Sequence, residues 1–207
     1  MSGESPIFDL SAGALCLDFA NTLGDRPTGR DERLASYGDV LAWALQARIL
    51  DAGTAGRLEG LALQHPEAAR QALRSTTALR EAIYRLFAAV AAHQPPRPQD
   101  LAHLNRTLGR ALSRLRVAAH EGSFGWRWKG EDAALDCVLW HVSRSAADLL
   151  VSADRDRVRE CDGRGCTWLF VDCSPRGNRR WCDMASCGNR AKARRHYRRL
   201  RRREGRT

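Results

Sequence analysis

Four cysteines near the end of the chain have the spacing of metal ligands. Cys161 and Cys166 enclose four residues, Cys182 and Cys187 enclose another four, and fifteen residues separate the two pairs. Four soft thiolates carried on two short loops match a closed tetrahedral zinc site, which has no open coordination position for a substrate. The pattern therefore predicts one structural Zn²⁺ ion with these four cysteines as its ligands.

The alternative interpretation is that the four thiols are reduced, unligated and close in sequence by chance. It must then explain how a segment of about thirty residues with little core of its own folds without a metal ion. Two further cysteines, Cys16 and Cys137, lie in apolar stretches and are interpreted as buried packing residues.

Short elements between and after the cysteine pairs would position the sulfurs. Trp168–Asp172 has the composition of a strand, turn-forming residues follow it, and Arg179–Cys182 can return as a second strand. From Cys187 onward, a helix can run to about Arg203, because the segment contains no proline. A loop, a hairpin and a helix that share one zinc ion make a treble-clef finger.

The predicted C-terminal helix has two different faces. Asn189, Ala193, Tyr197 and Leu200 recur on one side, where they are expected to pack on the hairpin. Arginine and lysine cover the rest of the helix, and like charges repel at a spacing of four residues. Such a helix makes sense beside a polyanion.

Nucleic-acid contacts are expected from the basic residues of the hairpin and the helix. Most of them would meet phosphates, which set affinity, whereas base edges would fall to Asn189 and Arg190, whose groups suit adenine and guanine. Alternatively, Asn189 braces the finger internally. Arg190 could likewise bridge to Asp183 or Asp172. The expected contacts are Arg176, Arg179, Arg180, Asn189, Arg190, Lys192, Arg194, Arg195, Arg198, Arg199 and Arg202.

The charge of the 207-residue chain is concentrated at this end. Residues 155–207 contain 17 Lys and Arg against 6 Asp and Glu, a balance of +11, whereas residues 1–154 carry −1, for a total of +10. A basic segment of this kind is the electrostatic footprint of a nucleic-acid module. Duplex DNA is the expected partner, and an RNA-binding or protein-interaction module is the alternative.

Other function classes find less support in the residues. A treble-clef nuclease needs histidines and acids around a catalytic metal, but the hairpin has no histidine and the helix only His196. No phosphate-binding glycine loop or nucleophile elbow occurs, so no enzyme is expected. A single-stranded RNA platform would need Trp168, Phe170 and Trp181 to be exposed. Without a membrane-length apolar run or a signal-peptide pattern, a cytoplasmic protein is expected, nucleoid-associated when bound to DNA.

Two stretches carry a family resemblance. Arg179–Lys192, which contains the run Cys-Gly-Asn-Arg, is similar to the signature of the CGNR zinc-finger family, and Leu15–Thr22 resembles the opening of the ABATE domain that precedes that finger. The resemblance implies a bacterial, stress-related transcription regulator whose N-terminal domain senses a ligand or has another regulatory role. Cys173 departs from the family, and the paired spacing favours leaving it outside the ligand set.

The remaining residues predict an α+β fold, with a mainly helical N-terminal domain (1–154) that contains a small β-hairpin, followed by the treble-clef-type finger (155–207). Ile7–Asn21 fits either a buried strand or the start of a helix. Ser36 is expected to cap one helix and Pro66 to begin the longest. The expected elements are helices over 37–47, 54–64, 66–92, 99–113 and 131–152, and strands over 115–120 and 124–128.

Two features of this domain could serve either binding or packing. The helix over 66–92 carries an apolar stripe that could form a homodimer, although packing within the chain is the more common use. Asp18, Asn21, Trp126 and Trp128 could line a pocket for a small-molecule effector. Alternatively, the two polar residues are paired internally and the tryptophans serve as core or cover. Because the linker is short, ligand binding could reach the finger mechanically.

Overall fold

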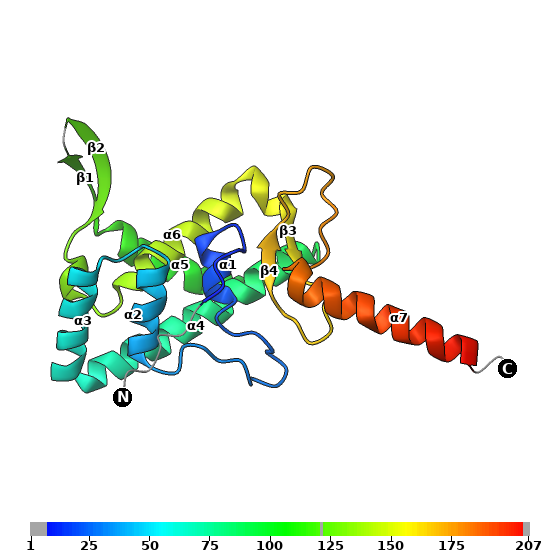
Figure 1. Cartoon of the computed structure of the whole chain (residues 1–207). Coiled ribbons are helices and arrows are strands. Elements are labelled where there is room, and N and C mark those ends of the chain that lie inside the picture. The colour runs from blue at the N-terminus through cyan, green and yellow to red at the C-terminus, as the bar shows by residue number, and fades with distance from the viewer. Residues whose placement is uncertain (1–7, 121, 205–207) are drawn as a thin grey trace.

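The computed structural model describes residues 8–120 and 122–204, and the side chains of residues 120, 198–200 and 202–204 lie outside that description. Figure 1 shows a group of helices from which one hairpin and the C-terminal helix project in different directions. The elements are α1 Leu15–Ala20, α2 Tyr37–Gln46, α3 Ala52–Gln64, α4 Pro66–Ala91, α5 Pro98–Leu112, β1 Leu115–His120, β2 Ser123–Trp128, η1 Glu131–Ala133, α6 Cys137–Val151, η2 Ala153–Arg157, β3 Val158–Glu160, β4 Leu169–Val171, η3 Met184–Gly188 and α7 Asn189–Glu204.

Helices α2, α3, α4 and α5 begin at or within two residues of the positions that the sequence predicts. Ser36 and Asp39 form a capping box at the start of α2, in which each side chain accepts a hydrogen bond from the other residue's backbone N–H. Asp51 caps α3, and Pro66 occupies the first turn of α4. The expected mainly helical region with a small antiparallel hairpin is confirmed.

The long helix α4 is the spine of this region. Its stripe of Ala72, Thr76, Leu79, Ile83 and Leu86 is buried, and α1, α5 and α6 contact the helix. Most of the stripe therefore packs within the chain, as the more common alternative proposed, and Val90 at its end is partly buried. Within the described residues, no helix combines the length and apolarity needed to cross a membrane.

The segment Ile7–Asn21, which the sequence left open between strand and helix, contains the short helix α1 over Leu15–Ala20, and its first residue lies outside the described residues. Leu17 and Phe19 have no exposed surface, and the Phe19 ring lies 5.0 Å from that of Trp43. Cys16 is also fully buried, as is Cys137 on α6, and burial raises the pKa of each thiol to about 12. Both cysteines are the packing residues that the sequence indicated.

The last helix of this region, α6, begins six residues later than the sequence suggests. The expected start is instead the separate turn η1, which is held by its own side chains. Glu131 contacts the His141 ring on α6, and the Asp132 carboxylate lies 3.4 Å from Arg57 on α3. These contacts fix the turn against two helices, so α6 starts only at Cys137.

Strands β1 and β2 form the hairpin that projects from the helices in Figure 1. Their register pairs Val117 with Trp126 and Leu115 with Trp128, which puts the two tryptophans on one face, as predicted. Trp128 packs against Trp140, but Trp126 is 61% exposed and Phe124, on the same face, is 80% exposed. Among the described residues, the outer part of this hairpin is thus a largely exposed apolar surface, with the Arg144 guanidinium 5.2 Å from the centroid of the Trp126 ring.

The predicted finger hairpin is wrong in its second strand. Strand β4 pairs with β3, antiparallel, and not with Arg179–Cys182. The Asp172 carboxylate accepts the backbone N–H groups of Ser174 and Arg179, which turns the chain away after β4. Because β3 precedes the first cysteine pair, the hairpin encloses that pair and does not separate the two pairs. The treble-clef type stays a prediction.

Helix α7 leaves the body of the molecule, as Figure 1 shows. It begins at Asn189, after the π-helical turn η3, and not at Cys187. The predicted packing of its apolar stripe on the hairpin is also wrong: Asn189, Ala193 and Tyr197 are exposed, and the side chain of Leu200 is outside the described residues. The stripe does not pack because α7 points outward from η3, and no hairpin lies beside it to receive these side chains.

Candidate metal centre

The sulfur atoms of Cys161, Cys166, Cys182 and Cys187 lie within 4.8 Å of one another. The Cys166 and Cys182 sulfurs are 3.8 Å apart, and those of Cys182 and Cys187 are 3.7 Å apart. Zn–S bonds of about 2.3 Å in a tetrahedron would separate the sulfurs by about 3.8 Å. The four cysteines thus form a site for one structural zinc ion.

The first cysteine pair lies in the turn between β3 and β4. The Cys161 backbone N–H donates to the Trp168 carbonyl at 2.9 Å and continues the ladder of the two strands. Gly163 packs so closely that a Cβ atom there would lie 2.9 Å from the Cys187 sulfur and 3.2 Å from the Cys161 sulfur. A glycine is required because a side chain would displace two ligands of the site.

The second pair is placed by the turn η3. Asp183 caps this turn and accepts the backbone N–H of Ser186 at 2.6 Å. Cys182 precedes the cap and Cys187 lies in the turn, so the two sulfurs meet on the side that faces the β3–β4 loop. A short capped turn therefore brings both sulfurs of the pair to the site.

Four thiolates this close together would need a cation among them. Backbone N–H groups of Gly163 and Cys182 point to the Cys161 sulfur at 3.4 and 3.3 Å, a setting that favours a thiolate. Hydrogen bonds from Cys166 and Cys182 lower the pKa of Cys161, whereas the bond to Cys161 raises the pKa of Cys166 to about 12. Ionisation of one thiol therefore makes ionisation of the neighbouring thiols less favourable. Four thiolates fit here only around a dication.

Arg190 contacts a zinc ligand directly. Its guanidinium donates to the Cys187 sulfur at 3.1 Å, and not to either aspartate considered from the sequence. Asn189 donates to the Ala185 carbonyl at 3.1 Å, which is the internal brace that the sequence left as an alternative. Sequence reasoning missed the sulfur contact, although the three-residue spacing from Cys187 to Arg190 on a helical turn could have indicated it.

The finger is braced by the first helix of the chain. The Asn21 side chain accepts the Leu169 backbone N–H at 2.9 Å and donates to the Leu169 carbonyl at 2.8 Å. On the same edge of β4, Val171 donates its N–H to the Ala12 carbonyl at 2.8 Å. The edge of β4 that faces away from β3 therefore has its hydrogen-bond partners in the N-terminal region.

Asp18, on α1, supports the contact between the N-terminal region and β4, which we call the α1–β4 junction. Its carboxylate accepts the Ala12 N–H at 2.9 Å, and burial raises the pKa of the group to about 6. Asp18 and Asn21 are thus internally paired, as the structural alternative proposed. The two tryptophans of the expected pocket, Trp126 and Trp128, instead line a separate open depression with Glu131 and His141.

The loop over 22–33 is held by buried cations. Arg80, which is 2% exposed, bonds both oxygens of Glu32 at 2.6 and 2.7 Å. Arg26 bonds Glu81 on α4 at 3.1 Å and reaches the Thr167 hydroxyl, in the finger, at 3.3 Å. This loop is a second connection between the helices and the metal site.

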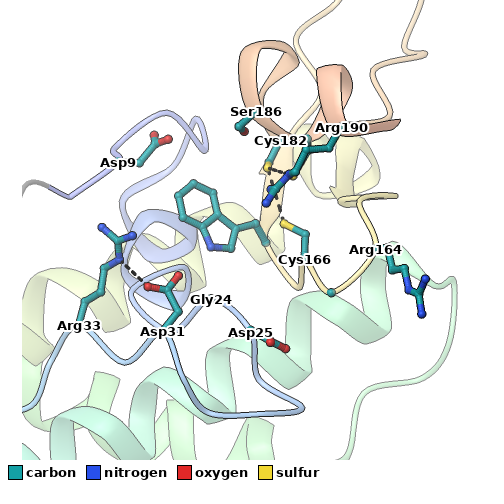
Figure 2. A pocket seen from close by; sticks show the side chains of 13 residues that line it. Asp9, Gly24, Asp25, Asp31, Arg33, Arg164, Cys166, Cys182, Ser186 and Arg190 are labelled. Carbon is teal, nitrogen blue, oxygen red and sulfur yellow. Dashed lines mark hydrogen bonds and ion pairs between the residues drawn. The ribbon is translucent and has the colours of Figure 1, made fainter. Parts of the chain in front are cut away.

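An open depression of about 390 Å³ lies between this loop and the finger. Figure 2 shows Asp25, Asp31 and Arg33 along one side, with the sulfurs of Cys166 and Cys182 and the side chain of Arg190 on the other. Three carboxylates (Asp9, Asp25, Asp31) and three guanidiniums (Arg33, Arg164, Arg190) line it, so neither charge dominates. The depression shows that the metal site borders the N-terminal region directly.

The expected nucleic-acid contacts are in different environments. Arg179 donates to the Trp181 carbonyl and stacks on Phe170, and Arg180 bonds Asp162 at 2.7 Å, so both support the finger. Arg176, Lys192 and Arg195 are exposed, and Arg194 is half-buried. The side chains of Arg198, Arg199 and Arg202 lie outside the described residues.

Two family models match the chain. The ABATE model, described as "Putative stress-induced transcription regulator", matches residues 13–153, and the CGNR zinc finger model matches residues 157–200. A comparison with curated proteins found no match. The two matched segments correspond to the helical region with its first helix α1 and to the four-cysteine site with most of α7.

Proposed function

This chain belongs to the ABATE family and carries a CGNR zinc finger, and from that premise we propose that it regulates transcription by binding duplex DNA through α7. The zinc ion has a structural role in this proposal, because four sulfur ligands fill a tetrahedron and leave no position for a substrate. The helical region acts as the regulatory part.

The outward projection of the basic helix carries the proposal. Lys192, Arg194 and Arg195 follow one another on α7, and among the described side chains none of the three has a carboxylate partner. An isolated helix of this width fits the major groove, which is about 12 Å wide. Phosphates would supply the counter-charges that the protein itself does not provide.

Two of the expected contact residues, one before α7 and one in its first turn, have internal roles that limit base recognition. Arg190 is bonded to a zinc ligand and Arg179 to backbone carbonyls of the finger. Asn189 is exposed, although its amide N–H donates to the preceding turn, so its carbonyl oxygen is available. We expect Asn189 and Lys192 to be nearest to base edges, and the later arginines to contact phosphates.

Duplex DNA is favoured over single-stranded RNA by the burial of the finger's aromatic residues. Phe170 has no exposed surface, and Trp168 and Trp181 are only partly exposed, so they offer no continuous platform on which bases could stack. Among the described side chains of α7, the exposed aromatic rings are those of Tyr197 and the neighbouring His196, with centroids 6.1 Å apart. A charged helix without such a platform suits a duplex backbone.

The junction between α1 and β4 gives the helical region a route to the finger. A ligand that shifts α1 would move Asn21, which is hydrogen-bonded to the backbone N–H and C=O of Leu169. Leu169 directly follows the turn with Cys161 and Cys166, the first zinc loop. We propose that effector binding to the helical region alters the position of the finger through this contact, and thereby alters DNA binding.

The test is the salt dependence of binding to a fluorescently labelled duplex by zinc-loaded protein. The variant Lys192→Ala with Arg195→Ala removes two exposed cations from α7 and should weaken binding. The slope of log K against log salt should become less steep by about 2, because each phosphate contact contributes about 0.9.

A matched control removes the same charge elsewhere. Arg116 and Arg127 are exposed and face each other across β1 and β2, on the hairpin that projects away from α7 in Figure 1. Arg116→Ala with Arg127→Ala should leave the slope unchanged. Equal slopes for the wild type and both double variants would show that α7 does not contact the nucleic acid and would refute the proposal.

A further inference from the structure

A cavity of about 470 Å³ opens between α4, α5 and α6, away from the zinc site. Four cationic or titratable basic side chains from two helices line it: Arg74 from α4, and His103, Arg106 and Arg110 from α5. Its size is within the range of about 300–1,000 Å³ that small-molecule sites occupy. The helical region as a whole is nearly neutral, so this concentration of positive charge is local.

The arginines of this cavity differ from the others on the same helices. Every other arginine of α4, α5 and α6 has a carboxylate partner: the pairs are Arg70–Glu67, Arg80–Glu32, Arg85–Asp100 and Arg144–Asp148.

By contrast, among the described side chains, Arg74, Arg106 and Arg110 have no ion-pair partner. Arg74 bonds only the neutral Gln71 side chain, at 2.7 Å. On these three helices, the arginines without an ion pair are therefore confined to the wall of the cavity, where they can converge on an anion from outside.

The floor of the cavity is apolar and aromatic. Leu139 and Trp140 of α6 are 5% and 3% exposed and line it. A further cation, the Arg114 guanidinium, lies 5.5 Å from the centroid of the Trp140 ring. Asp136 is the one carboxylate among the lining residues, and it marks the side that a ligand's negative group would avoid.

His103 reports the electrostatics of the site. Burial, followed by the charge of Arg106, lowers its pKa, and Asp100 acts in the opposite direction. A bound anion would relieve the repulsion among the cations and would favour the charged imidazole. The cavity thus presents more cationic hydrogen-bond donors than carboxylate acceptors, above an apolar surface formed by Leu139 and Trp140.

We propose that this cavity binds a small organic oxyanion, a phosphate or carboxylate group whose attached apolar or aromatic part rests on Leu139 and Trp140. Bidentate hydrogen bonds from Arg106 and Arg110 hold the anionic group. Binding itself is independent of the DNA-binding function, whereas its role as the effector step rests on that proposed function.

One helix connects the cavity to the finger. Arg74 lies on α4, and further along the same helix the Tyr84 hydroxyl donates to Glu160 at the end of β3, at 3.1 Å. Cys161 follows Glu160 directly. An anion that draws α5 toward α4 would therefore act on the helix that supports the first zinc loop.

The experiment uses the full zinc-loaded chain and phenyl phosphate as the probe, at constant ionic strength. The His103 ring resonances are followed by NMR, and inorganic phosphate and duplex DNA are titrated separately. We expect a saturable shift of His103 with phenyl phosphate, a weaker response to inorganic phosphate, and no shift with DNA. A shift produced by DNA alone would assign the cations to the DNA backbone and overturn the small-ligand proposal.

Variants give the second readout. Arg106→Gln with Arg110→Gln should weaken phenyl phosphate binding by about tenfold or more, since two charge-assisted hydrogen bonds are lost. Arg70→Gln with Arg144→Gln removes two arginines from the same group of helices outside the cavity and should leave binding unchanged.

Zinc content and the far-ultraviolet spectrum establish that each variant is folded. Saturable binding that survives in the cavity variant, or no saturable shift of His103 in the wild type, would overturn the proposal. DNA affinity is measured in parallel, so loss of the anion site and failure of α7 to bind DNA give separate results.

Discussion

The two hairpins of this molecule have the same topology and opposite surroundings. Strands β1 and β2 span six residues each and project into solvent, with Phe124 80% exposed. Strands β3 and β4 span three residues each, yet Leu169 and Phe170 have no exposed surface. The longer hairpin is held by its own cross-strand pairs, whereas the shorter one depends on its neighbours.

The difference explains where function is expected. A two-stranded hairpin is marginal by itself in water. For β3 and β4, the missing stability comes from the metal site in their connecting loop and from Asn21 and Ala12, which continue the hydrogen bonding of β4. A hairpin that depends on two outside partners transmits a change in either one, which is what a regulatory junction requires.

The largest expected effect is loss of the metal. Cys182→Ser should release zinc and unfold the finger, because metal binding supplies most of the folding free energy of such a segment, on the order of 10 kcal/mol. The helical region should stay folded. Metal analysis of the purified variant is the measurement, with Cys173→Ser as the matched control that keeps its zinc. Full zinc content in Cys182→Ser would refute this ligand set.

The second effect concerns the brace from α1. Asn21→Ala should reduce the free energy of unfolding by about 1–3 kcal/mol, because it leaves the buried N–H and C=O of Leu169 without partners. Urea unfolding of the zinc-loaded protein measures this loss. Asn178→Ala, at an exposed turn position, should change stability little. If both variants are equally stable, the finger folds independently of α1.

Asp18 gives the junction a predictable response to pH. Its folded pKa, about 6, lies above the usual value for aspartate, so the folded state binds the proton more tightly and stability falls as pH rises through about 6. Asp18→Asn keeps the acceptor for the Ala12 N–H and removes the buried charge. At pH 7.5, the variant should be more stable by about 1–3 kcal/mol.

The pH test compares urea unfolding of both proteins, loaded with zinc, at pH 5.5 and 7.5. The advantage of Asp18→Asn should shrink at the lower pH, where the wild-type carboxyl begins to bind its proton in the folded state. An advantage of the same size at both values would show that the Asp18 carboxyl does not titrate in this interval.

The smallest effect is expected on the projecting hairpin. Phe124→Ser should change the stability of the monomer by less than about 0.5 kcal/mol, because the side chain is exposed. Thermal unfolding at low protein concentration measures it. A larger loss that grows with protein concentration would show that a second copy covers this face.

The metal ligands could be predicted from sequence because their signal is local. Two cysteine pairs with short spacings specify the site almost without reference to the remainder of the chain. The signals for helix starts at Ser36 and Pro66 are equally local, and both starts are confirmed. The partner of β4 and the contact of Asn21 with Leu169 depend on residues far apart in sequence, and no pattern within either segment contains that information.

The errors on α7 have a related cause. A stripe at helical spacing indicates which side chains share a face, but it does not supply a surface to receive them. Tyr197 and Ala193 share a face and remain exposed, since the preceding turn directs the helix outward. The same outward direction is the basis for the proposed DNA contact.

The central claim is that this zinc-supported helix binds duplex DNA. Selection of random duplexes by the zinc-loaded full chain, with the retained fragments sequenced at low and moderate salt, tests it most directly. We predict retention at low salt and an enriched motif that persists at moderate salt. A palindromic motif would indicate that the protein binds as a dimer. No retention of any duplex at low salt would contradict the account.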